Sequence, residues 1–239
     1  MKLVGITRIR NEEGIIQNTL DHVAKFVDEV YVYDDASTDN TAEICENHKI
    51  VSEIFKNYTW DSSVNGRAKA EGIMRQTLYE VAVRNGADWV YCFDADEYIE
   101  FNQTDWKADS YFFRLFDFYI TPHDIGEPYS NRQFMGPEYR DIPMLFWANN
   151  KIKFKSRVPQ NYGKAEFGGY VRHYGKAISV EQWDKDCDYY SEIRWKGKNE
   201  ELQKRWKERK GKAIHTESDF GRPLITWEDK FDLSKIVAI

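Results

Sequence analysis

Short apolar runs alternate with amphipathic stretches along the first hundred residues. The run KLVGITRI is rich in β-branched residues and ends in the polar turn RNEEG, which is typical of a buried strand. In the next stretch, apolar side chains recur at helical spacing, at Ile16, Leu20, Val23 and Val27. The segment EVYVYDDAS is again a short apolar run. These segments predict a strand, a helix and a strand, the βαβ unit of parallel sheets.

The same alternation continues to residue 100. Ser37, Thr38 and Asp39 offer side chains that cap a helix over TAEICENH, and IVSEIF predicts a third strand. A helix over EGIMRQTLYEVAVRNG ends at Asn85 and Gly86 and precedes a fourth strand, DWVYCFD. The pattern predicts an α/β fold with a doubly wound, mostly parallel central sheet flanked by helices, whose ligands bind at the carboxyl ends of the strands.

Beyond residue 101 the pattern loosens. SYFFRLFDFYI and PMLFW predict aromatic strands, separated by a polar loop that contains proline and glycine. The charged stretch KNEELQKRWKERKGK predicts a solvated helix closed by Gly211. We therefore expect one domain in two halves, residues 1–100 and 101–188, followed by a C-terminal helical extension over residues 189–239.

Composition argues against several classes of protein. The net charge of −6 disfavours a nucleic-acid partner, because neutralising phosphates needs a basic surface. The three cysteines are widely spaced and lack a CxxC pair, which indicates neither a disulfide framework nor a zinc site and favours a reducing compartment. No apolar run reaches the length of a signal-peptide core or of a membrane helix. We expect a soluble, cytoplasmic protein whose contact with membranes is at most peripheral.

Two acidic clusters follow predicted strands. Asp34 and Asp35 end the second strand, and the run DADE at 94–97 ends the fourth. The carboxyl ends of neighbouring parallel strands share one crevice, where several carboxylates repel each other unless positive charge is present. A hard divalent cation, Mn²⁺ or Mg²⁺, bridging a diphosphate is the simplest source of that charge. In the alternative interpretation, each acid caps the helix or turn that follows it.

The order of these motifs resembles the nucleotide-binding half of family 2 glycosyltransferases of the GT-A fold. The resemblance rests on RNEE at 10–13, DDASTDNT at 34–41, Arg75 in the preceding helix and the DxD-like DAD at 94–96. The chain departs from the family pattern at Ala36, where glycine is usual, and at Arg8 and Arg10, where proline and tyrosine are usual. The resemblance implies that residues 1–100 bind a nucleotide sugar and that residues 101–188 form the acceptor side.

The resemblance also implies roles for single residues. Asp35 would contact the uracil or another base, with Arg8 and Arg10 lining the same pocket. Asp94 would face the ribose. Asp96 would bind the metal that bridges the two phosphates and stabilises the departing nucleoside diphosphate.

Three basic residues precede the DAD motif, and each has two explanations. Arg67, Lys69 and Arg75 would add positive charge near the diphosphate. A solvated helix face explains any one of them equally well.

A histidine downstream is a further candidate metal ligand. Many GT-A enzymes complete the metal site with such a residue, and His173 in GGYVRHYGKAIS resembles it. A neutral imidazole, added to carboxylate and phosphate oxygens, suits manganese. A hydrogen-bonded structural histidine is the alternative, and His123 and His215 are weaker candidates for the ligand.

The catalytic base is the least defined residue. An inverting transferase needs a carboxylate that takes the proton from the acceptor hydroxyl, and Glu138 and Asp141 in MGPEYRDIPMLF are the candidates. Each is also a plausible loop or strand-edge acid. A retaining enzyme would need no base at that place, and the sequence leaves the stereochemistry open.

Together these features predict a metal-dependent, hexosyltransferase-like glycosyltransferase that moves a sugar from a nucleoside-diphosphate donor, UDP-linked by preference, to a glycan hydroxyl. One alternative is a non-catalytic module that binds nucleotide or glycan, although such a module would not need the self-repelling acids Asp94 and Asp96. The other is a sugar-phosphate nucleotidyltransferase. That class opens with a glycine-rich loop, which ITRIRNEEG lacks.

Overall fold

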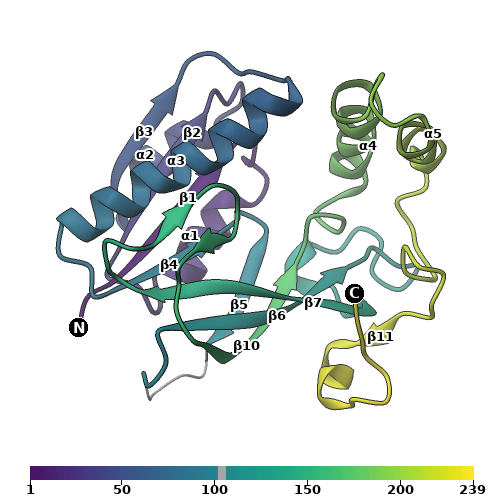
Figure 1. Cartoon of the computed structure of the whole chain (residues 1–239). Helices are drawn as coiled ribbons and strands as arrows, with labels where there is room; N and C mark the ends of the chain where they lie inside the picture. The colour runs from purple at the N-terminus through teal and green to yellow at the C-terminus, as the bar shows by residue number, and fades with distance from the viewer. Residues whose placement is uncertain (102–105) are drawn as a thin grey trace. The chain divides into compact units, whose positions relative to one another are not determined.

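A mixed β-sheet runs through the chain in this computed structural model, which describes residues 1–101 and 106–239, without the side chains at positions 64, 65, 67–69 and 101. Its strands are β1 (Leu3–Ile9), β2 (Glu29–Asp35), β3 (Val51–Asn57), β4 (Trp89–Phe93), β5 (Glu97–Phe101), β6 (Ser110–Phe118), β7 (Phe134–Trp147), β10 (Ala165–His173), β11 (Ile225–Thr226) and β12 (Val237–Ala238). The main path follows the order β3-β2-β1-β4-β7-β6-β10-β5, and β11 and β12 pair with β7 (Figure 1). Two further short strands, β8 (Lys153–Phe154) and β9 (Pro159–Gln160), form a separate antiparallel hairpin.

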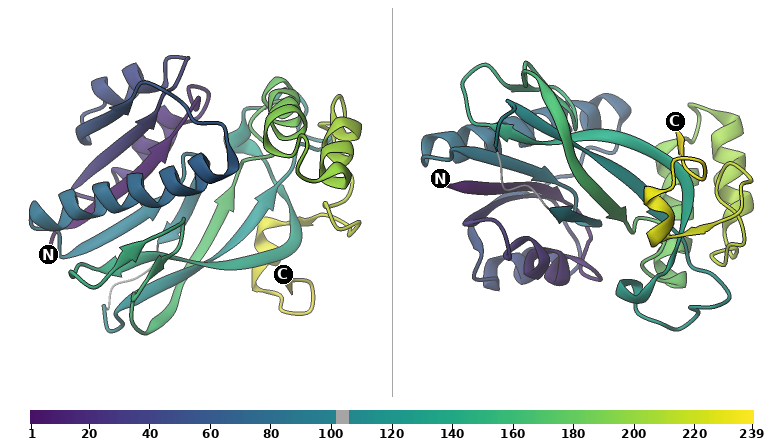
Figure 2. Two further views of the ribbon diagram at one scale, coloured as in Figure 1. Left: turned by 45° about the horizontal axis from the view of Figure 1, so that its top comes forward. Right: turned by 90° about the horizontal axis from the view of Figure 1, so that it is seen from below.

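The N-terminal part of the sheet is parallel and carries helices on both faces. β1 pairs in parallel with β2 and β4, and β2 pairs in parallel with β3. One face is covered by α3 and the other by α1 and α2, as Figure 2 shows. The bounds of these helices are α1 (Ile16–Val23), α2 (Thr41–Asn47) and α3 (Val64–Arg84). Because both faces are covered, β4 is buried along its whole length, and the predicted α/β class is confirmed.

Two helices begin at other residues than the sequence predicts. α3 starts at Val64, before the stretch that showed helical spacing, and the Ser63 side chain caps it by accepting a hydrogen bond from Gly66 N. α2 starts after Asn40, and of the three predicted capping residues Asp39 contributes, because its Oδ1 accepts a hydrogen bond from Thr41 N over 3.0 Å. Ser37 and Thr38 stabilise the preceding loop instead, since Ser37 donates to Asp34 and Thr38 N donates to Asn11 Oδ1 over 2.8 Å.

The chain divides into two compact units. Unit 1 comprises residues Met1–Arg114 and Asp141–Val171, and unit 2 comprises Leu115–Arg140 and Arg172–Ile239. This division differs from the expected boundaries at residues 100 and 188. The roles assigned to residues 1–100, 101–188 and 189–239 therefore stay predictions.

Strand β7 replaces part of a predicted loop. It spans 14 residues and includes Gly136 and Pro137, which the sequence pattern places in a turn-rich connection. Four consecutive residues from Met135 to Glu138 are buried, and β11 and β12 pair with this part of the strand. Met135 pairs with Ile225, about 90 residues further along the chain. This long-range pairing outweighs the local preference of Gly136 and Pro137 for a loop.

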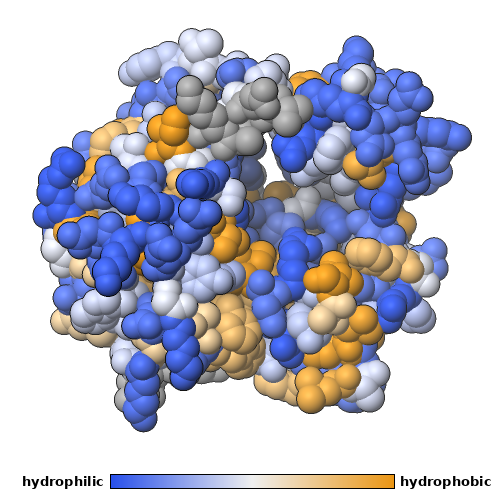
Figure 3. Space-filling model, in the orientation of Figure 1, coloured by the Kyte–Doolittle hydropathy of each residue, from blue (hydrophilic) through white to orange (hydrophobic). Residues whose placement is uncertain are grey.

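Unit 2 ends in short helices and an irregular tail. Its helical segments are η1 (Tyr129–Asn131), α4 (Val180–Asp188), the π-helical η2 (Tyr189–Arg194), α5 (Glu200–Arg209) and η3 (Trp227–Phe231). α5 confirms the predicted charged helix, and Gly211 after it has a φ of 76°, the left-handed conformation that ends many helices. Near the end of the chain Phe231, Leu233 and Ile239 are exposed, and apolar residues gather over this segment in Figure 3. No helix in the described ranges is both long enough and apolar enough to cross a bilayer.

Candidate active site

The candidate site lies where three parallel strands of unit 1 end. β1 lies between β2 and β4, and the register pairs Ile9 with Asp34 and Thr7 with Phe93. Asp35 and Asp94 each follow by one residue. The carboxyl ends of β2 and β4 therefore bring the two acidic clusters to one edge of the sheet.

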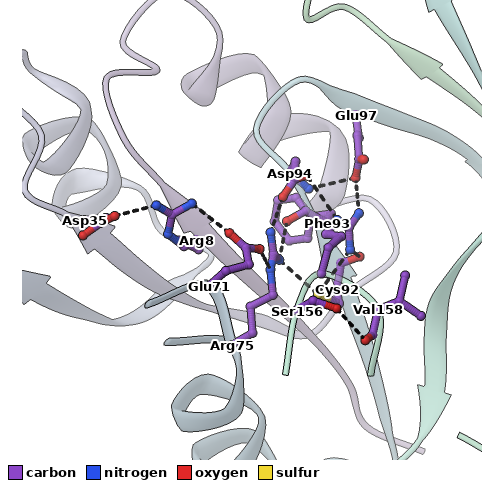
Figure 4. Close-up of polar contacts among 11 residues, drawn as sticks. Arg8, Asp35, Glu71, Arg75, Cys92, Phe93, Asp94, Glu97, Ser156 and Val158 are labelled. Carbon is purple, nitrogen blue, oxygen red and sulfur yellow. Dashed lines mark hydrogen bonds and ion pairs between the residues drawn. The ribbon is translucent and has the colours of Figure 1, made fainter. Parts of the chain in front are cut away.

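Arginine and acidic side chains alternate along this edge (Figure 4). Arg8 donates to Asp35 Oδ2 over 2.5 Å and to Glu71 Oε2 over 2.9 Å. Glu71 also accepts a hydrogen bond from Arg75, one helical turn further along α3. Arg75 in turn donates to Asp94 Oδ1. This chain of ion pairs links the end of β2 to the end of β4.

A third arginine extends the chain of ion pairs. Arg157, in the loop of the β8–β9 hairpin, donates to Asp94 Oδ2 over 3.1 Å and to Glu97 Oε2 over 2.5 Å. It also donates to the carbonyl oxygen of Cys92 over 3.1 Å. Both carboxylate oxygens of Asp94 therefore accept a hydrogen bond from an arginine.

We call this set of seven residues the charge network: Asp35, Arg8, Glu71, Arg75, Asp94, Arg157 and Glu97. It sets three guanidinium groups against four carboxylates. Arginines of the chain therefore supply most of the positive charge that compensates the acidic clusters, and the divalent cation stays a prediction. A cation that binds with a diphosphate would meet a network already close to neutrality.

Arg75 lies at the centre of the charge network and is buried, so its charge state depends on the residues that it contacts. Arg75 is only 2% exposed. Burial alone would lower the pKa of Arg75, but the carboxylates of Asp94 and Glu71 outweigh it and raise the pKa well above the ordinary value. Burial also raises the pKa of the Cys92 thiol, which accepts a hydrogen bond from Arg75 over 3.1 Å. Arg75 therefore stays a cation, and Cys92 stays protonated.

The loop after β2 is held by Arg10. Its guanidinium donates to the carbonyl oxygens of Asp35, over 2.9 Å, and of Ala36, and it lies 4.0 Å from the centre of the Trp60 ring. Ala36 has a φ of 57°, which is unfavourable for a side chain with a Cβ atom and explains why glycine is usual there in the family that the sequence resembles. Asn57 donates to the second carboxylate oxygen of Asp35 over 3.2 Å.

The turn that carries the DAD motif is fixed from several sides. Asp94 N donates to Glu97 Oε2 over 2.9 Å, and Glu97 N donates to the Asp94 carbonyl over 3.2 Å. The Thr19 hydroxyl of α1 donates to the Ala95 carbonyl. Asp96 is partly exposed within this turn. Among the residues that the structure describes, no three His, Cys, Asp or Glu side chains form a group that would hold a metal ion without further ligands.

His173, the second predicted metal ligand, lies in unit 2 and forms a pair with Asp117. The distance from His173 Nδ1 to Asp117 Oδ1 is 2.6 Å. Asp117 also accepts hydrogen bonds from Lys176, over 2.8 Å, and Arg140, over 3.1 Å. Burial would raise the pKa of Asp117, but Lys176, His173 and Arg140 hold it well below its usual range. Carboxylates that bind one nitrogen of a histidine in this way orient the ring for ligation through the other nitrogen.

The two candidate bases lie in different units. Glu138, in unit 2, is buried and accepts a hydrogen bond from Ser218 Oγ over 2.9 Å, with Arg222 Nε 3.4 Å away. Asp141, in unit 1, is about one third exposed and pairs with Arg114 over 3.2 Å. Each carboxylate therefore has a cationic partner. The assignment of the base stays a prediction.

The side chains of two predicted residues, Arg67 and Lys69, lie outside the part of the chain that the structure describes. Glu71, Arg157 and Asp117 are the residues that the sequence analysis missed. Glu71 could have been predicted, because it lies four residues before Arg75 on one helix, a spacing at which opposite charges pair. No pattern in the neighbouring sequence identifies Arg157 or Asp117.

Two hollows at the surface lie apart from the charge network. One of about 340 Å³ lies between α3 and the β8–β9 hairpin, lined by Gly72, Ile73, Gln76, Thr77, Phe154 and Lys155. None of the predicted site residues lines it. Since the chemistry lies at the sheet edge, we assign the site from the charge network and not from this hollow.

The N-terminal part of the chain, which contains most of the charge network, is similar to a known protein family. Residues 6–104 match the family model described as glycosyl transferase family 2. The chain therefore carries a family 2 glycosyltransferase segment. All members of the charge network except Arg157 lie within the matched residues. The strand order and this match agree with the expected GT-A type of fold.

Two curated relatives match part of the chain. They are the uncharacterized protein Mb3815c of Mycobacterium bovis and the uncharacterized protein Rv3786c of Mycobacterium tuberculosis. Each is 36% identical over 100 residues, which is 42% of this chain and 24% of the relative. The match thus spans about a quarter of the length of these relatives.

Similarities to solved structures are looser. Residues 1–349 of TarS from S. aureus are 17% identical with a TM-score of 0.43, over 87% of this chain and 71% of that one. Glucosyl-3-phosphoglycerate synthase from Mycobacterium tuberculosis, crystallised with Mn²⁺, UDP and glucosyl-3-phosphoglycerate, is 18% identical with a TM-score of 0.28, over 40% of this chain and 34% of that one. The fold assignment stands on the strand order of this chain and not on these scores.

Proposed function

We propose that this chain transfers a sugar from a nucleoside-diphosphate sugar, UDP-linked by preference, to a hydroxyl group of a glycan. One observation carries the proposal: the family 2 segment folds so that Asp35 and Asp94 meet at the carboxyl edge of parallel strands, joined by arginines. In α/β sheets, this edge is where nucleotides bind.

The base end of the donor site is formed by Asp35, Arg8 and Arg10. Asp35 is 2% exposed, and its carboxylate accepts hydrogen bonds from Arg8 and Asn57. An ionised carboxylate has about four lone-pair positions, so two acceptor positions remain for the N–H group of a base. The contacts of Arg10 with the Asp35 and Ala36 carbonyls fix the loop that shapes this pocket.

The diphosphate end is formed by the turn at 94–97 and the arginines beside it. Asp94 is the proposed ribose contact. Arg75, which donates to Asp94, and Arg67 on the same helix are the proposed sources of positive charge near the phosphates. Positive charge at this place stabilises the negative charge that develops on the leaving nucleoside diphosphate.

The residues present fit a divalent cation bound together with the diphosphate. Magnesium and manganese are commonly held by one or two carboxylates while phosphate oxygens complete the coordination, so a preformed group of three protein ligands is not required. Asp96, in unit 1, would supply a carboxylate to this cation. In unit 2, His173 stays a predicted ligand, and its contact with Asp117 would orient the ring for ligation through the other nitrogen. When bound, such a cation acts as a Lewis acid on the phosphate oxygens.

The acceptor hydroxyl must lose a proton when it attacks the sugar. We propose that Glu138 or Asp141 takes it in an inverting reaction. Ser218 and Arg222 hold the Glu138 carboxylate in one orientation, and Arg114 does the same for Asp141. Replacing each acid by its amide separates the two, because the true base loses turnover while donor binding is retained.

A second candidate function is a binding module without catalysis. It is favoured by the pairing of both Asp94 oxygens with arginines, because an acidic cluster that the chain neutralises itself does not require a metal for its stability. The two functions differ in turnover. A transferase should slowly hydrolyse its nucleotide-sugar donor in the presence of Mn²⁺, whereas a binding module should not.

The test is a binding screen of UDP, GDP, CMP and dTDP with and without Mn²⁺, followed by hydrolysis assays with the sugar conjugates of the nucleotide that binds best. We expect UDP to bind most tightly and its sugar conjugate to be hydrolysed. Binding without hydrolysis of any conjugate would favour the module, and failure of all four nucleotides to bind would contradict both functions.

A further inference from the structure

Arg157 reaches the turn at residues 94–97, called the DAD turn, from a hairpin about 60 residues further along the chain. β8 and β9 pair through Lys153 with Gln160 and Phe154 with Pro159. The four residues between them form a loop, in which Ser156 Oγ donates to the Val158 carbonyl over 3.2 Å (Figure 4). The position of the Arg157 guanidinium therefore depends on where the hairpin lies.

The hairpin lies on one face of α3. Phe154 N donates to the side chain of Gln76 over 2.8 Å, and the buried Phe154 ring packs 5.7 Å from the ring of Tyr79. Gly72, one turn before Gln76, faces the backbone of Lys155 so closely that a Cβ atom there would lie 2.8 Å from the Lys155 carbonyl carbon and oxygen. Only glycine allows this approach without a shift of the hairpin.

The contacts of Arg157 join both ends of the DAD turn. Nε donates to Asp94, Nη2 donates to Glu97, and Nη1 donates to the carbonyl of Cys92 on β4. The Arg157 side chain is 18% exposed and that of Glu97 only 3%, so these ion pairs are shielded from water. A planar guanidinium group can hold three acceptors in a fixed geometry, which a lysine ammonium group cannot.

We propose that Arg157 is a positioning residue of the donor site, set in place by the close contact of the β8–β9 hairpin with Gly72. The inference rests on the proposed function, since it assigns Arg157 to the binding of the nucleoside diphosphate. Arg157 acts through Asp94 and Glu97, which it holds at the two ends of the turn. Asp96 lies between them, so its placement depends on the same contacts.

A purely structural role would have different consequences. An arginine that only stabilises the fold would lower the melting temperature when it is replaced and leave the metal dependence of donor binding unchanged. A positioning residue changes the concentration of Mn²⁺ that half-saturates UDP binding, because metal sites respond to the residues that orient their ligands by about tenfold to 100-fold in affinity.

The experiment compares the full chain with the variants R157K, G72A and R157K/G72A. R157K keeps the charge but loses the planar fork, and G72A displaces the hairpin without touching the DAD turn. The control for G72A is G86A, at the end of the same helix, where a Cβ atom would meet nothing within 4 Å. The control for R157K is R84K, at an exposed position of α3. Calorimetry gives the UDP affinity and its Mn²⁺ dependence, and circular dichroism gives the melting temperature.

We expect R157K and G72A each to weaken Mn²⁺-dependent UDP binding by about tenfold or more, and the double variant to bind no more weakly than R157K alone. G86A and R84K should bind UDP as the unaltered chain does. The inference would be overturned if R157K bound UDP with unchanged affinity and unchanged Mn²⁺ dependence. It would also be overturned if the loss of UDP affinity in the double variant equalled the product of the losses in R157K and G72A. Failure of the unaltered chain to bind any nucleotide would instead refute the proposed function, and the inference with it.

Discussion

Single residues at the edge of the sheet are stabilised by alternating charge. Arg75 is a buried member of the charge network and contacts two carboxylates, those of Glu71 and Asp94. Removal of one partner from a buried ion pair leaves an uncompensated charge, which costs far more than the loss of an exposed pair. The network therefore makes the stability of unit 1 depend on the same residues that we assign to donor binding.

Replacement of Arg75 tests this dependence. We expect Arg75→Met to lower the free energy of unfolding by about 3 kcal/mol, because Glu71 and Asp94 lose their shared cation. Arg84→Met, at an exposed position in the last turn of the same helix, is the control and should cost less than about 1 kcal/mol. Urea denaturation measures both values. Equal effects of the two substitutions would show that the network contributes no more than a surface charge.

Backbone conformation gives a second prediction for a single residue. Ala36 adopts a φ of 57°, so Ala36→Gly should remove the steric cost of the Cβ atom and raise the free energy of unfolding by up to about 1 kcal/mol. Gly86 has a φ of 82°, and Gly86→Ala should lower the free energy by about the same amount. Denaturation curves of the two variants check the signs, and a loss of stability in Ala36→Gly would contradict the account.

At the scale of helices and strands, the sequence predicted the parallel half of the sheet well. Continuous apolar runs mark β1, β2 and β4, and each run is a signal contained within a few residues. The first half of β7 was missed because Gly136 and Pro137 suggest a loop, whereas its pairing with β11 and β12 comes from distant segments. The β8–β9 hairpin was missed for the same reason, since its place depends on α3.

Packing between elements of unit 2 gives a prediction on pH. His215 lies between the rings of Tyr119 and Trp183, at 5.0 and 4.8 Å, and burial lowers its pKa from 6.5 to about 4. Between these two values the unfolded chain binds a proton that the folded chain does not. Stability should therefore fall as the pH is lowered from 6.5 to 4.

The variant His215→Phe tests the cause of this loss. It keeps an aromatic ring but cannot take up a proton, so it should lose on the order of 2 kcal/mol less than the unaltered chain between pH 6.5 and pH 4. It also lacks the hydrogen bond to the Ala213 carbonyl, which should cost about 1 kcal/mol at every pH. His123→Phe, at an exposed position, is the control. If the free energy of unfolding of His215→Phe and of the unaltered chain fell equally between pH 6.5 and pH 4, the loss could not be assigned to His215.

At the scale of the whole molecule, the proposed donor residues concentrate in unit 1. The family 2 match and the charge network both lie there, whereas His173 and Glu138 belong to unit 2. The acids of the site could be predicted because strand ends and short motifs identify Asp35 and Asp94. Their arginine partners could not all be predicted, since Arg157 reaches Asp94 across 63 residues of chain. Asp117 likewise pairs with His173 across 56 residues.

The central claim is that the DAD turn binds a nucleoside diphosphate together with a divalent cation. Calorimetric titration of UDP in the presence of Mn²⁺ into the unaltered chain and into Asp96→Ala tests it most directly, with the exposed acid variant Asp21→Ala as the control. We predict that Asp96→Ala weakens UDP binding by about tenfold or more and removes its dependence on Mn²⁺, while Asp21→Ala binds normally. UDP binding by Asp96→Ala with unchanged affinity and unchanged Mn²⁺ dependence would contradict the claim.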